Sequence, residues 1–432
     1  MRCTYSCGSA EHVLSRRSFL GGTAALLGGA VAGVPGFSPF ALADSLEKKR
    51  KQILVVYLAG GSSQLETWDP KPKTETGGPF GAIETSVPGI MISELLPRTA
   101  KLMHLMALVR GVNTHAAAVD DHGKGDYLMH TGRAQAPGQE YPRLGAVASK
   151  FLGKETDALP GYIHIAPGHG GLGRNESAFL GPRHAPLYLG NGQAPANTLR
   201  DPAITDPADQ SRQAFRCMLN DRFAKRRRSA ETEAYTSTYE QAAKLMRERD
   251  VFDISKEHAA DRFRYGDFDF GRHCLLARRL LEAGATYVQC VHSNYDTHNE
   301  NFAFHLEQVG EFDQGFSALL EDLHVRGRLE HTLVIVMSEF GRTPHINFYQ
   351  GRDHWCKAWS IALAGCGIKK GIALGKTNAK GTEVVDHEVT GGHLFHTYLN
   401  AVGLDPAGGF EVDGRPIQIA EPTATSIKEL LA

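Results

Sequence analysis

Short apolar runs and longer stretches with helical spacing alternate along the C-terminal half of this chain. The apolar runs have strand length and no charged residues, which predicts buried strands over residues 285–291, 332–337 and 359–365. Between and after them, apolar positions recur at helical spacing, which predicts helices over residues 275–283, 302–325 and 389–402. Buried strands that alternate with helices are typical of parallel βαβ units, in which helices cover both faces of one sheet.

The N-terminal half shows the same kind of pattern less regularly. Residues 53–58 form a continuous apolar run before Gly60-Gly61, which predicts a buried strand that ends in a tight turn. Residues 211–250 are expected to form one long charged helix, with Arg226-Arg227-Arg228 on a solvated face. We also expect a helix leading into a strand over 95–109, helical spacing over 114–130, a strand at 161–165 and a loop-rich insertion around 135–210.

The N-terminal residues have the layout of an export signal. Ser15-Arg16-Arg17-Ser18-Phe19-Leu20 precedes an apolar run, rich in glycine and alanine, that ends near Ala41-Leu42-Ala43. Paired arginines, a weakly hydrophobic stretch and a small-x-small cleavage site are the features of a twin-arginine signal. A membrane anchor is the alternative, but the run is shorter than the roughly 20 residues that a span needs.

We therefore expect residues 1–43 to direct the chain through the twin-arginine export machinery to the periplasm or beyond. Residues 44–432 would then form a single α/β domain with no membrane span. The composition is that of a soluble globular protein, with 42% hydrophobic and 22% charged residues. A formal net charge of −1 argues against capture of nucleic acid or anionic lipid by overall charge.

The cysteines give little information about the compartment. Five remain after the proposed cleavage site, and none has CxxC spacing, so we expect neither a disulfide scaffold nor a thiolate zinc site. A single disulfide stays open, without a pairing that the sequence assigns.

Segments that carry imidazoles and carboxylates border the predicted strands. In parallel sheets ligands gather beyond the carboxyl ends of the strands, so we expect these segments to meet at one edge. Imidazole and carboxylate without thiolate suit zinc, manganese, iron or calcium, according to geometry. Asp296 and His298 are close enough in sequence to chelate one ion, whereas of the neighbours Asp353 and His354 one would bind and the other support it. The five segments are 60–63, 68–69, 292–301, 338–344 and 351–355.

At these residues the chain resembles the DUF1501 family, a set of twin-arginine-exported bacterial proteins placed in the alkaline phosphatase and sulfatase superfamily. The resemblance covers almost the whole chain. It implies a three-layer α/β/α sandwich around a mostly parallel sheet, with metal ions at the strand ends. The matching motifs are Gly60-Gly61-Ser62-Ser63-Gln64-Leu65-Glu66-Thr67-Trp68-Asp69-Pro70-Lys71, His130-Thr131-Gly132-Arg133, Tyr295-Asp296-Thr297-His298, Ser338-Glu339-Phe340-Gly341-Arg342-Thr343-Pro344 and Gly351-Arg352-Asp353-His354-Trp355.

The resemblance also implies roles for single residues. In sulfatases the nucleophile stands nine residues before the threonine of a segment ending Leu-Thr-Gly-Arg, and His122 occupies that position here. Histidine could form a phosphohistidine, but it cannot form the hydrated formylglycine of sulfatases. Asp296 and His298 resemble an Asp/His metal pair of the superfamily, and His354 resembles its last histidine ligand.

Two motifs depart from the superfamily pattern. The usual Ser-Asp-His-Gly is Ser338-Glu339-Phe340-Gly341 here, so Glu339 can replace the aspartate ligand but Phe340 cannot replace the histidine. The aspartate that usually ends the first strand is absent, and Asp69 is the candidate to replace it from the loop. The resemblance therefore implies one divalent ion more readily than two.

The first function that fits is a metal-dependent hydrolase of phosphate or sulfate esters, on a small molecule or a polysaccharide. His122 would be the nucleophile or general base, and Arg342 and Lys124 would neutralise the anionic ester. The metal ligands would be Asp296, His298, Glu339 and His354, with Asp353 and Asp69 as further candidates.

Two other functions remain open. A non-catalytic binding protein is favoured by Phe340 and by the missing hydroxyl or thiol nucleophile. A nucleotide-binding enzyme is suggested by Gly365-Cys366-Gly367 with Gly371 nearby, but this segment misses the GxGxxG spacing.

Overall fold

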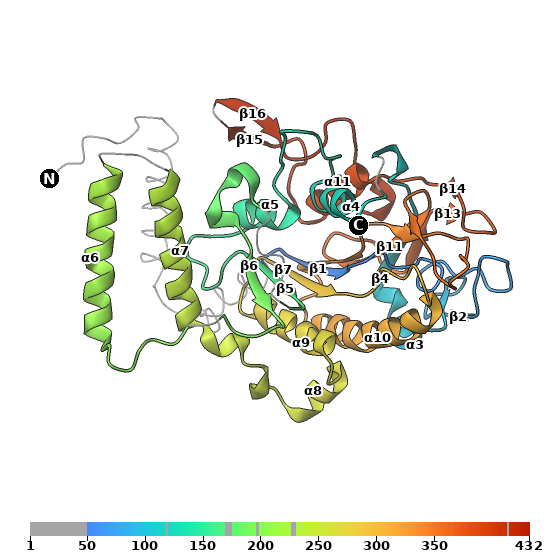
Figure 1. The fold of residues 1–432 in the computed structure, drawn as a ribbon, viewed down its shortest axis with the longest axis horizontal. Helices are drawn as coiled ribbons and strands as arrows, with labels where there is room; N and C mark the ends of the chain where they lie inside the picture. The colour runs from blue at the N-terminus through green and yellow to red at the C-terminus, as the bar shows by residue number, and fades with distance from the viewer. Residues whose placement is uncertain (1–49, 118–119, 169–174, 196–197, 226–229, 413) are drawn as a thin grey trace, which may run out of the picture. The chain divides into compact units, whose positions relative to one another are not determined.

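One sheet of eight strands organises the chain (Figure 1). The computed structural model describes residues 50–117, 120–168, 175–195, 198–225, 230–412 and 414–432. The leader at 1–43 and the arginines at 226–228 lie outside these described residues, and the structure does not test the predictions made for them.

The strand order is β12-β4-β11-β8-β1-β7-β5-β6. Five of the seven pairings are parallel, and only β11 runs antiparallel to its neighbours β4 and β8. The predicted α/β class with a mostly parallel sheet is therefore confirmed. The strands are β1 (Gln52–Leu58), β4 (Met106–Val112), β5 (Tyr162–Ala166), β6 (Leu187–Gly190), β7 (Tyr287–His292), β8 (Thr332–Met337), β11 (Trp359–Gly365) and β12 (Ile372–Leu374).

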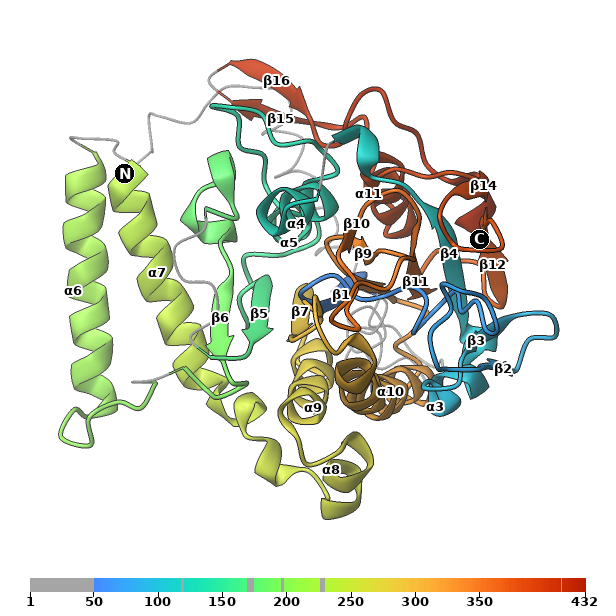
Figure 2. The same ribbon diagram turned by 45° about the vertical axis from the view of Figure 1, so that its right-hand side comes forward.

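Helices cover both faces of this sheet, as Figures 1 and 2 show. On one face lie α3 (Pro97–Lys101), α9 (Asp269–Glu282) and α10 (Asn301–Val325), and on the other α4 (His122–Thr131), α5 (Leu144–Phe151) and α11 (Gly391–Ala401). Alternate residues of β1 enter the two cores, since Leu54 and Val56 pack with α9 and α10 while Ile53 and Val55 pack with α5 and α11. Burial on both sides explains why this strand is apolar from Ile53 to Leu58.

The remaining elements are short or peripheral. α6 (Asp206–Ala224) and α7 (Ala230–Arg247) lie side by side, and α8 (Ala259–Tyr265) precedes α9. Two-stranded sheets pair β2 (Ala82–Glu84) with β3 (Met91–Ser93), β9 (Gly341–Arg342) with β10 (His354–Trp355), β13 (Lys376–Thr377) with β14 (Val384–Asp386), and β15 (Gly409–Val412) with β16 (Arg415–Gln418). Single 3-10 turns are η1 (Met103–Leu105), η2 (His115–Ala117), η3 (Ala178–Leu180), η4 (Pro182–His184), η5 (Arg249–Phe252), η6 (Ile254–Lys256) and η7 (Lys428–Leu430).

Three expectations about elements were wrong in detail. β11 is antiparallel, because no crossover helix separates it from β8; the chain returns directly through β9 and β10. The long helix expected over 211–250 is two helices, α6 and α7. The helical spacing over 114–130 becomes a helix only from His122, because the side chain of Asp121 accepts the backbone N–H of Lys124 and caps the helix there.

The segment at 135–210 contributes α5, β5 and β6, and so belongs to the main sheet. Cys217, Cys274, Cys290, Cys356 and Cys366 are free thiols. Among the described residues, every helix is too short or too polar to cross a lipid bilayer.

Candidate functional site

Three polar segments meet where β1, β7 and β8 end. The turn after β1 contacts the segments after β8 and β7. The Gly60 N–H donates to Glu339 Oε1 at 2.9 Å, and the loop after β7 passes directly beside Gly60. A Cβ on Gly60 would lie 2.4 Å from the backbone nitrogen of Asp296, and φ is +118° at this position. Only glycine allows such a close approach in this conformation.

The segment before β11 reaches the same edge from the opposite direction. Because β11 is antiparallel, it begins where the parallel strands end, and β10 delivers His354 to that edge. The prediction that distant segments converge on one sheet edge therefore agrees with the geometry. The segment with His354 reaches this edge because β11 begins there, whereas the other segments follow strands that end there.

Three possible metal donors face one another across this edge. His298 Nε2 lies 3.1 Å from His354 Nε2 and 3.2 Å from Asp296 Oδ1, and His354 Nε2 lies 3.4 Å from the same oxygen. Donors bound tetrahedrally to one zinc ion at about 2.0–2.1 Å would lie about 3.3–3.4 Å apart. The spacing of the donor atoms therefore fits a single metal ion.

The far side of each of these two imidazoles is held by an acceptor. His298 Nδ1 donates to Asp353 Oδ1 at 2.7 Å, and His354 Nδ1 donates to the Asp120 carbonyl at 2.6 Å. With the hydrogen on Nδ1, each neutral ring presents a lone pair at Nε2. Two lone pairs at this separation repel unless a proton or a metal ion lies between them. Carboxylate and carbonyl partners behind the histidine ligands are typical of metal sites.

Asp296 is the centre of the charge arrangement. Burial raises its pKa, but the hydrogen bond and charge of Arg342, together with the nearby histidines, hold the pKa below its ordinary value. The pKa of Asp353 is likewise lowered, chiefly by the hydrogen bond from His298. Both carboxyl groups are therefore ionised at neutral pH and available as acceptors.

His122 lies on the other side of Asp296. It is the first residue of α4, its Nε2 lies 3.4 Å from Asp296 Oδ2, and its Nδ1 lies 2.7 Å from Glu339 Oε1. The hydrogen bond to Glu339 raises the pKa of His122, against a smaller opposing effect of burial. His122, Asp296 and His354 also form a compact group of possible metal donors, all within 4.8 Å of one another.

Glu339 was expected to be a metal ligand, but the structure gives it other contacts. Its carboxylate is buried and is engaged by His122 and by the Gly60 N–H. The neighbouring Ser338, which was not singled out from the sequence, accepts the N–H groups of Gly61 and Ser62 at 3.1 and 3.0 Å. Its position directly after a buried strand was the available signal.

Arg342 is more deeply buried than a substrate-binding residue would be. Its side chain is 0% exposed, and its Nη2 donates to Asp296 Oδ1 at 2.5 Å. Its other donors bind the backbone carbonyls of Gly60, Gly61 and Arg352. Arg342 thus fixes Asp296 and the β1 turn.

Phe340 packs against two of the histidines. Its ring centroid lies 5.0 Å from that of His122 and 4.4 Å from that of His354. It supplies no donor atom, and it limits the rotation of both rings.

Two further sequence candidates lie outside the donor cluster. Asp69 contacts Lys71 Nζ at 2.9 Å and Thr377 Oγ1 at 2.5 Å, and no contact joins it to the histidines of the site among the described residues. Lys124 is exposed on the first turn of α4 and lines a shallow cavity with residues 135–140. The Asp120 carbonyl had no sequence signal, because a backbone acceptor is independent of the side chain.

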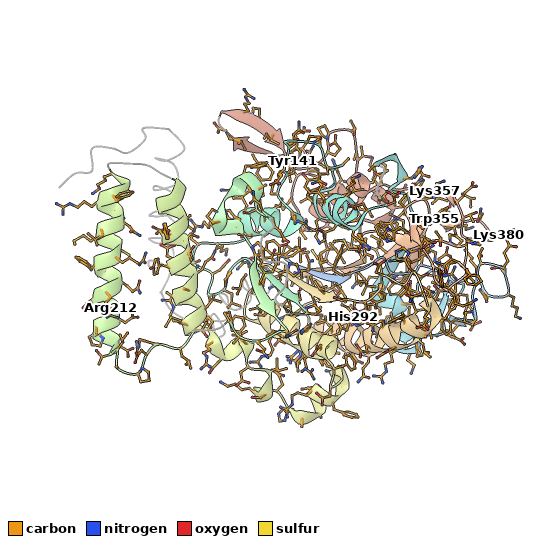
Figure 3. The ribbon with its side chains drawn as sticks, in the orientation of Figure 1. Tyr141, Arg212, His292, Trp355, Lys357 and Lys380 are labelled. Atoms are coloured by element: carbon orange, nitrogen blue, oxygen red, sulfur yellow. The ribbon has the colours of Figure 1, made fainter. Side chains whose placement is uncertain are left out.

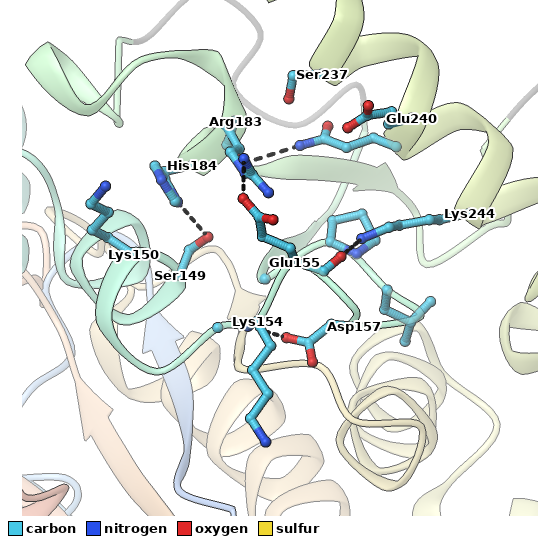
Figure 4. A pocket seen from close by; sticks show the side chains of 15 residues that line it. Ser149, Lys150, Lys154, Glu155, Asp157, Arg183, His184, Ser237, Glu240 and Lys244 are labelled. Atoms are coloured by element: carbon cyan, nitrogen blue, oxygen red, sulfur yellow. Dashed lines mark hydrogen bonds and ion pairs between the residues drawn. The ribbon is translucent and has the colours of Figure 1, made fainter. Parts of the chain in front are cut away.

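A separate cavity of about 200 Å³ lies between α5 and α7 (Figure 4). Ser149 Oγ lies 3.0 Å from His184 Nδ1 there, and Arg183 pairs with Glu155 at 2.9 Å. None of the residues of the donor cluster lines this cavity.

A family model described as "Protein of unknown function (DUF1501)" matches residues 50–431. No match was found among curated proteins. Among solved structures, the PsFucS1 sulfatase from Pseudoalteromonas sp. has a TM-score of 0.41 at 13% sequence identity, covering 84% of this chain and 70% of that one. A protein in the alkaline phosphatase superfamily from Vibrio parahaemolyticus has a TM-score of 0.40 at 10% identity, covering 82% and 67%. The C-terminal periplasmic domain of EcEptC from Escherichia coli, in complex with Zn, has a TM-score of 0.37 at 10% identity, covering 86% and 87%.

Proposed function

We propose that this chain, which belongs to the DUF1501 family of proteins of unknown function, is a metal-dependent hydrolase of phosphate or sulfate esters. The observation that carries the proposal is the meeting of His298 Nε2, His354 Nε2 and Asp296 Oδ1 within 3.4 Å of one another. A metal ion here would be shared by all three acceptors, beside the hydrogen bond that Asp296 Oδ1 accepts from Arg342. Two imidazoles and one carboxylate suit zinc or manganese better than calcium, which prefers oxygen ligands alone.

Asp296, His298 and His354 would hold this ion. When bound, a divalent metal lowers the pKa of a coordinated water and polarises an ester oxygen. Asp353 and the Asp120 carbonyl keep the two imidazoles in the binding tautomer. Arg342 donates to the same Asp296 oxygen that faces the two imidazoles, and so acts as a positioning residue.

His122 is the proposed general base or acid. Glu339 fixes the hydrogen at its Nδ1, so Nε2 is the atom that accepts or returns a proton on the side of Asp296. His122 also begins α4, whose N-terminal end favours the negative charge of a phosphate or sulfate ester. Lys124 lies on the same turn and is the proposed contact for the more distant part of an anionic substrate.

Metal analysis and an ester screen on one preparation test this function. Wild type is expected to carry about one equivalent of zinc or manganese and to hydrolyse aryl phosphate or aryl sulfate until a chelator is added. A His298→Ala/His354→Ala variant should lose both properties, whereas His345→Ala, an exposed histidine near the site, should keep them. A fully metal-loaded wild type with no turnover on a broad ester panel would contradict the proposal.

The second candidate is a binding protein that holds a metal and an anionic ligand without turning it over. Phe340 favours it, because an apolar ring packs against both His122 and His354 at the position where a further donor would be expected. Turnover that disappears in His122→Ala would decide for the enzyme. Equal ligand affinity in wild type and His122→Ala, without turnover in either, would decide for the binding protein.

We also propose that the chain is exported by the twin-arginine route. The support is the sequence of residues 15–43. An Arg16→Lys/Arg17→Lys variant is expected to accumulate uncleaved inside the cell, as immunoblots of cell fractions would show. Normal export of that variant would contradict this route.

A further inference from the structure

Helix α6 presents a row of large apolar side chains to solvent. Phe215, Met218, Leu219 and Phe223 are 58%, 53%, 46% and 51% exposed. Their spacing places them on one side of the helix. Soluble proteins seldom leave a contiguous apolar patch of this kind without a partner.

The side of α6 next to this row packs on α7. Asn220 Nδ2 donates to Thr236 Oγ1 of α7 at 3.1 Å, and the guanidinium of Arg216 lies 4.7 Å from the ring centroid of Tyr239. Figures 1 and 2 show α6 on the side of α7 that is turned away from the main sheet. The apolar row borders this contact and stays about half exposed among the described residues.

Cations lie within and beside the row. Arg212, which Figure 3 labels, comes three residues before Phe215, and Arg222 comes four residues after Met218, so both share its side of the helix. From 206 to 225 the chain has four basic and three acidic residues, and the bases Arg212, Arg222 and Lys225 lie on the side of the row.

We propose that the exposed side of α6 is a docking surface for an anionic lipid bilayer. The apolar row would enter the headgroup region, while Arg212, Arg222 and Lys225 contact lipid phosphates. A helix with interleaved aromatic and basic side chains has the chemistry of an interfacial membrane anchor. Contact between two copies of the row is disfavoured, because it would bring the same cations against one another. The docking surface is independent of the proposed catalysis.

The test uses a chain that starts at Asp44, because residues 50–432 form a compact unit of their own. Its sedimentation with phosphatidylcholine vesicles is measured with and without added phosphatidylglycerol. Wild type is expected to bind only the anionic vesicles and to be released by salt. Arg212→Gln/Arg222→Gln should weaken partitioning roughly 30-fold, at about 1 kcal/mol for each cation near the surface. Phe215→Ser/Phe223→Ser should remove binding.

Matched variants control for charge and for exposed aromatic area elsewhere. Lys150→Gln/Lys154→Gln removes two exposed cations beside the α5–α7 cavity (Figure 4), and Phe263→Ser/Phe348→Ser removes two rings that are 82% and 91% exposed. Both variants should bind like wild type. Equal binding to vesicles without phosphatidylglycerol, no binding at all, or equal losses in the control variants would overturn the proposal. A wild-type dimer that Phe215→Ser/Phe223→Ser dissociates, with no vesicle binding, would assign the row to a second copy instead.

Discussion

In each histidine of the site, an oxygen acceptor binds Nδ1 and thereby fixes the direction of Nε2. Asp353, the Asp120 carbonyl and Glu339 take the Nδ1 hydrogens of His298, His354 and His122. All three Nε2 atoms consequently face the Asp296 carboxylate. The Nε2 atoms of His298 and His354 lie 3.1 Å apart and form the proposed binding pair, whereas His122 packs on His354 at 4.6 Å between ring centroids and is also bound to Glu339.

Removing the ring of His122 separates catalysis from metal binding. We expect His122→Ala to lower kcat by about 10²–10⁴-fold, the usual contribution of a general acid or base. The metal content should stay unchanged, because the other three donors remain. Steady-state kinetics and elemental analysis of the same sample check this, with His345→Ala as the control. Loss of the metal together with kcat would make His122 a ligand.

Asp353 acts on the metal only through His298. Replacing it by Asn removes the charge that holds the ring, and we expect metal affinity to fall about 10–100-fold. Competition with a chromophoric chelator measures this affinity. Asp386→Asn is the matched control, since Asp386 makes a similar exposed contact with His387 at 2.9 Å, far from the site in sequence. An unchanged affinity in Asp353→Asn would remove this carboxylate from the site.

Turns and short ladders bring these side chains together. The turn after β1 touches the loops that follow β7 and β8, and the β9–β10 ladder places His354 opposite Arg342. These contacts involve backbone atoms, so the geometry of the site depends on tight turns as much as on its charged groups.

Gly60→Ala tests the turn after β1. The added Cβ would lie 2.4 Å from the Asp296 nitrogen, so we expect metal affinity and stability both to fall, the latter by more than the roughly 1–3 kcal/mol of backbone strain alone. Gly89→Ala is the control, because φ is +84° there and no atom lies within 4 Å of the new Cβ. Urea unfolding and metal titration measure the two effects. Equal losses of stability in both variants, with normal metal binding, would show that the positive φ alone destabilises Gly60→Ala and that the contact with Asp296 adds nothing.

A buried ion pair anchors the loop that carries Asp353 and His354. Arg352 Nη2 and Nε bind both oxygens of Glu66 at 2.7 and 3.0 Å, and neither side chain is exposed. Burial raises the pKa of Glu66, but Arg352 and His305 outweigh it and lower the pKa, so the carboxylate is charged. Arg352 also binds the carbonyls of Thr343 and Pro344.

Breaking this pair leaves an uncompensated charge in the interior. We expect Glu66→Ala to cost about 3–5 kcal/mol of unfolding free energy. Glu75→Ala, which removes an exposed partner of Lys380, should cost about 0–1 kcal/mol. Chemical denaturation of the two variants compares their free energies of unfolding. Similar small losses of unfolding free energy would show that water reaches the pair of Glu66 and Arg352.

The sequence predicted the elements that are set by local patterns. Continuous apolar runs identified β1, β7, β8 and β11, because a strand buried on both faces has few polar positions. The direction of β11 was missed, since an apolar run reads the same in either orientation. The candidate donors Asp296, His298 and His354 came from their place beside strands. The role of Asp120 and the burial of Arg342 depend on tertiary contacts that no local pattern encodes.

At the level of the whole molecule, a buried polar network joins α4, α5 and β7. Asp126 lies 2.6 Å from Arg143 Nη2 and 3.1 Å from His130 Nδ1, and His130 Nε2 lies 3.1 Å from Gln289 Oε1. Burial raises the pKa of Asp126, but the hydrogen bonds and charges of His130 and Arg143 hold it well below its ordinary value. The carboxylate therefore stabilises the fold wherever it is ionised.

This network makes stability depend on acid pH in a defined direction. The pKa of an unfolded aspartate is about 3.9, so the stabilisation by Asp126 is complete above roughly pH 5. It is lost as the pH falls below the pKa of the unfolded group. We expect Asp126→Asn to cost about 3–5 kcal/mol at pH 7 and progressively less below pH 4. Denaturation of both proteins over this range measures the difference. Glu155→Gln, in an exposed pair with Arg183, should show no such trend, and a constant gap for Asp126→Asn would contradict the assignment.

The central position of β1 bears on how the chain is made. β1 leaves the ribosome early, yet its neighbours β7 and β8 begin only at Tyr287 and Thr332. At roughly 5–20 residues per second, this apolar strand waits on the order of 10–50 seconds for partners, with both hydrogen-bonding edges open. Residues 52–58 can pair with other nascent chains during that interval. We expect a chaperone that recognises short apolar segments to bind them until β7 and β8 are made.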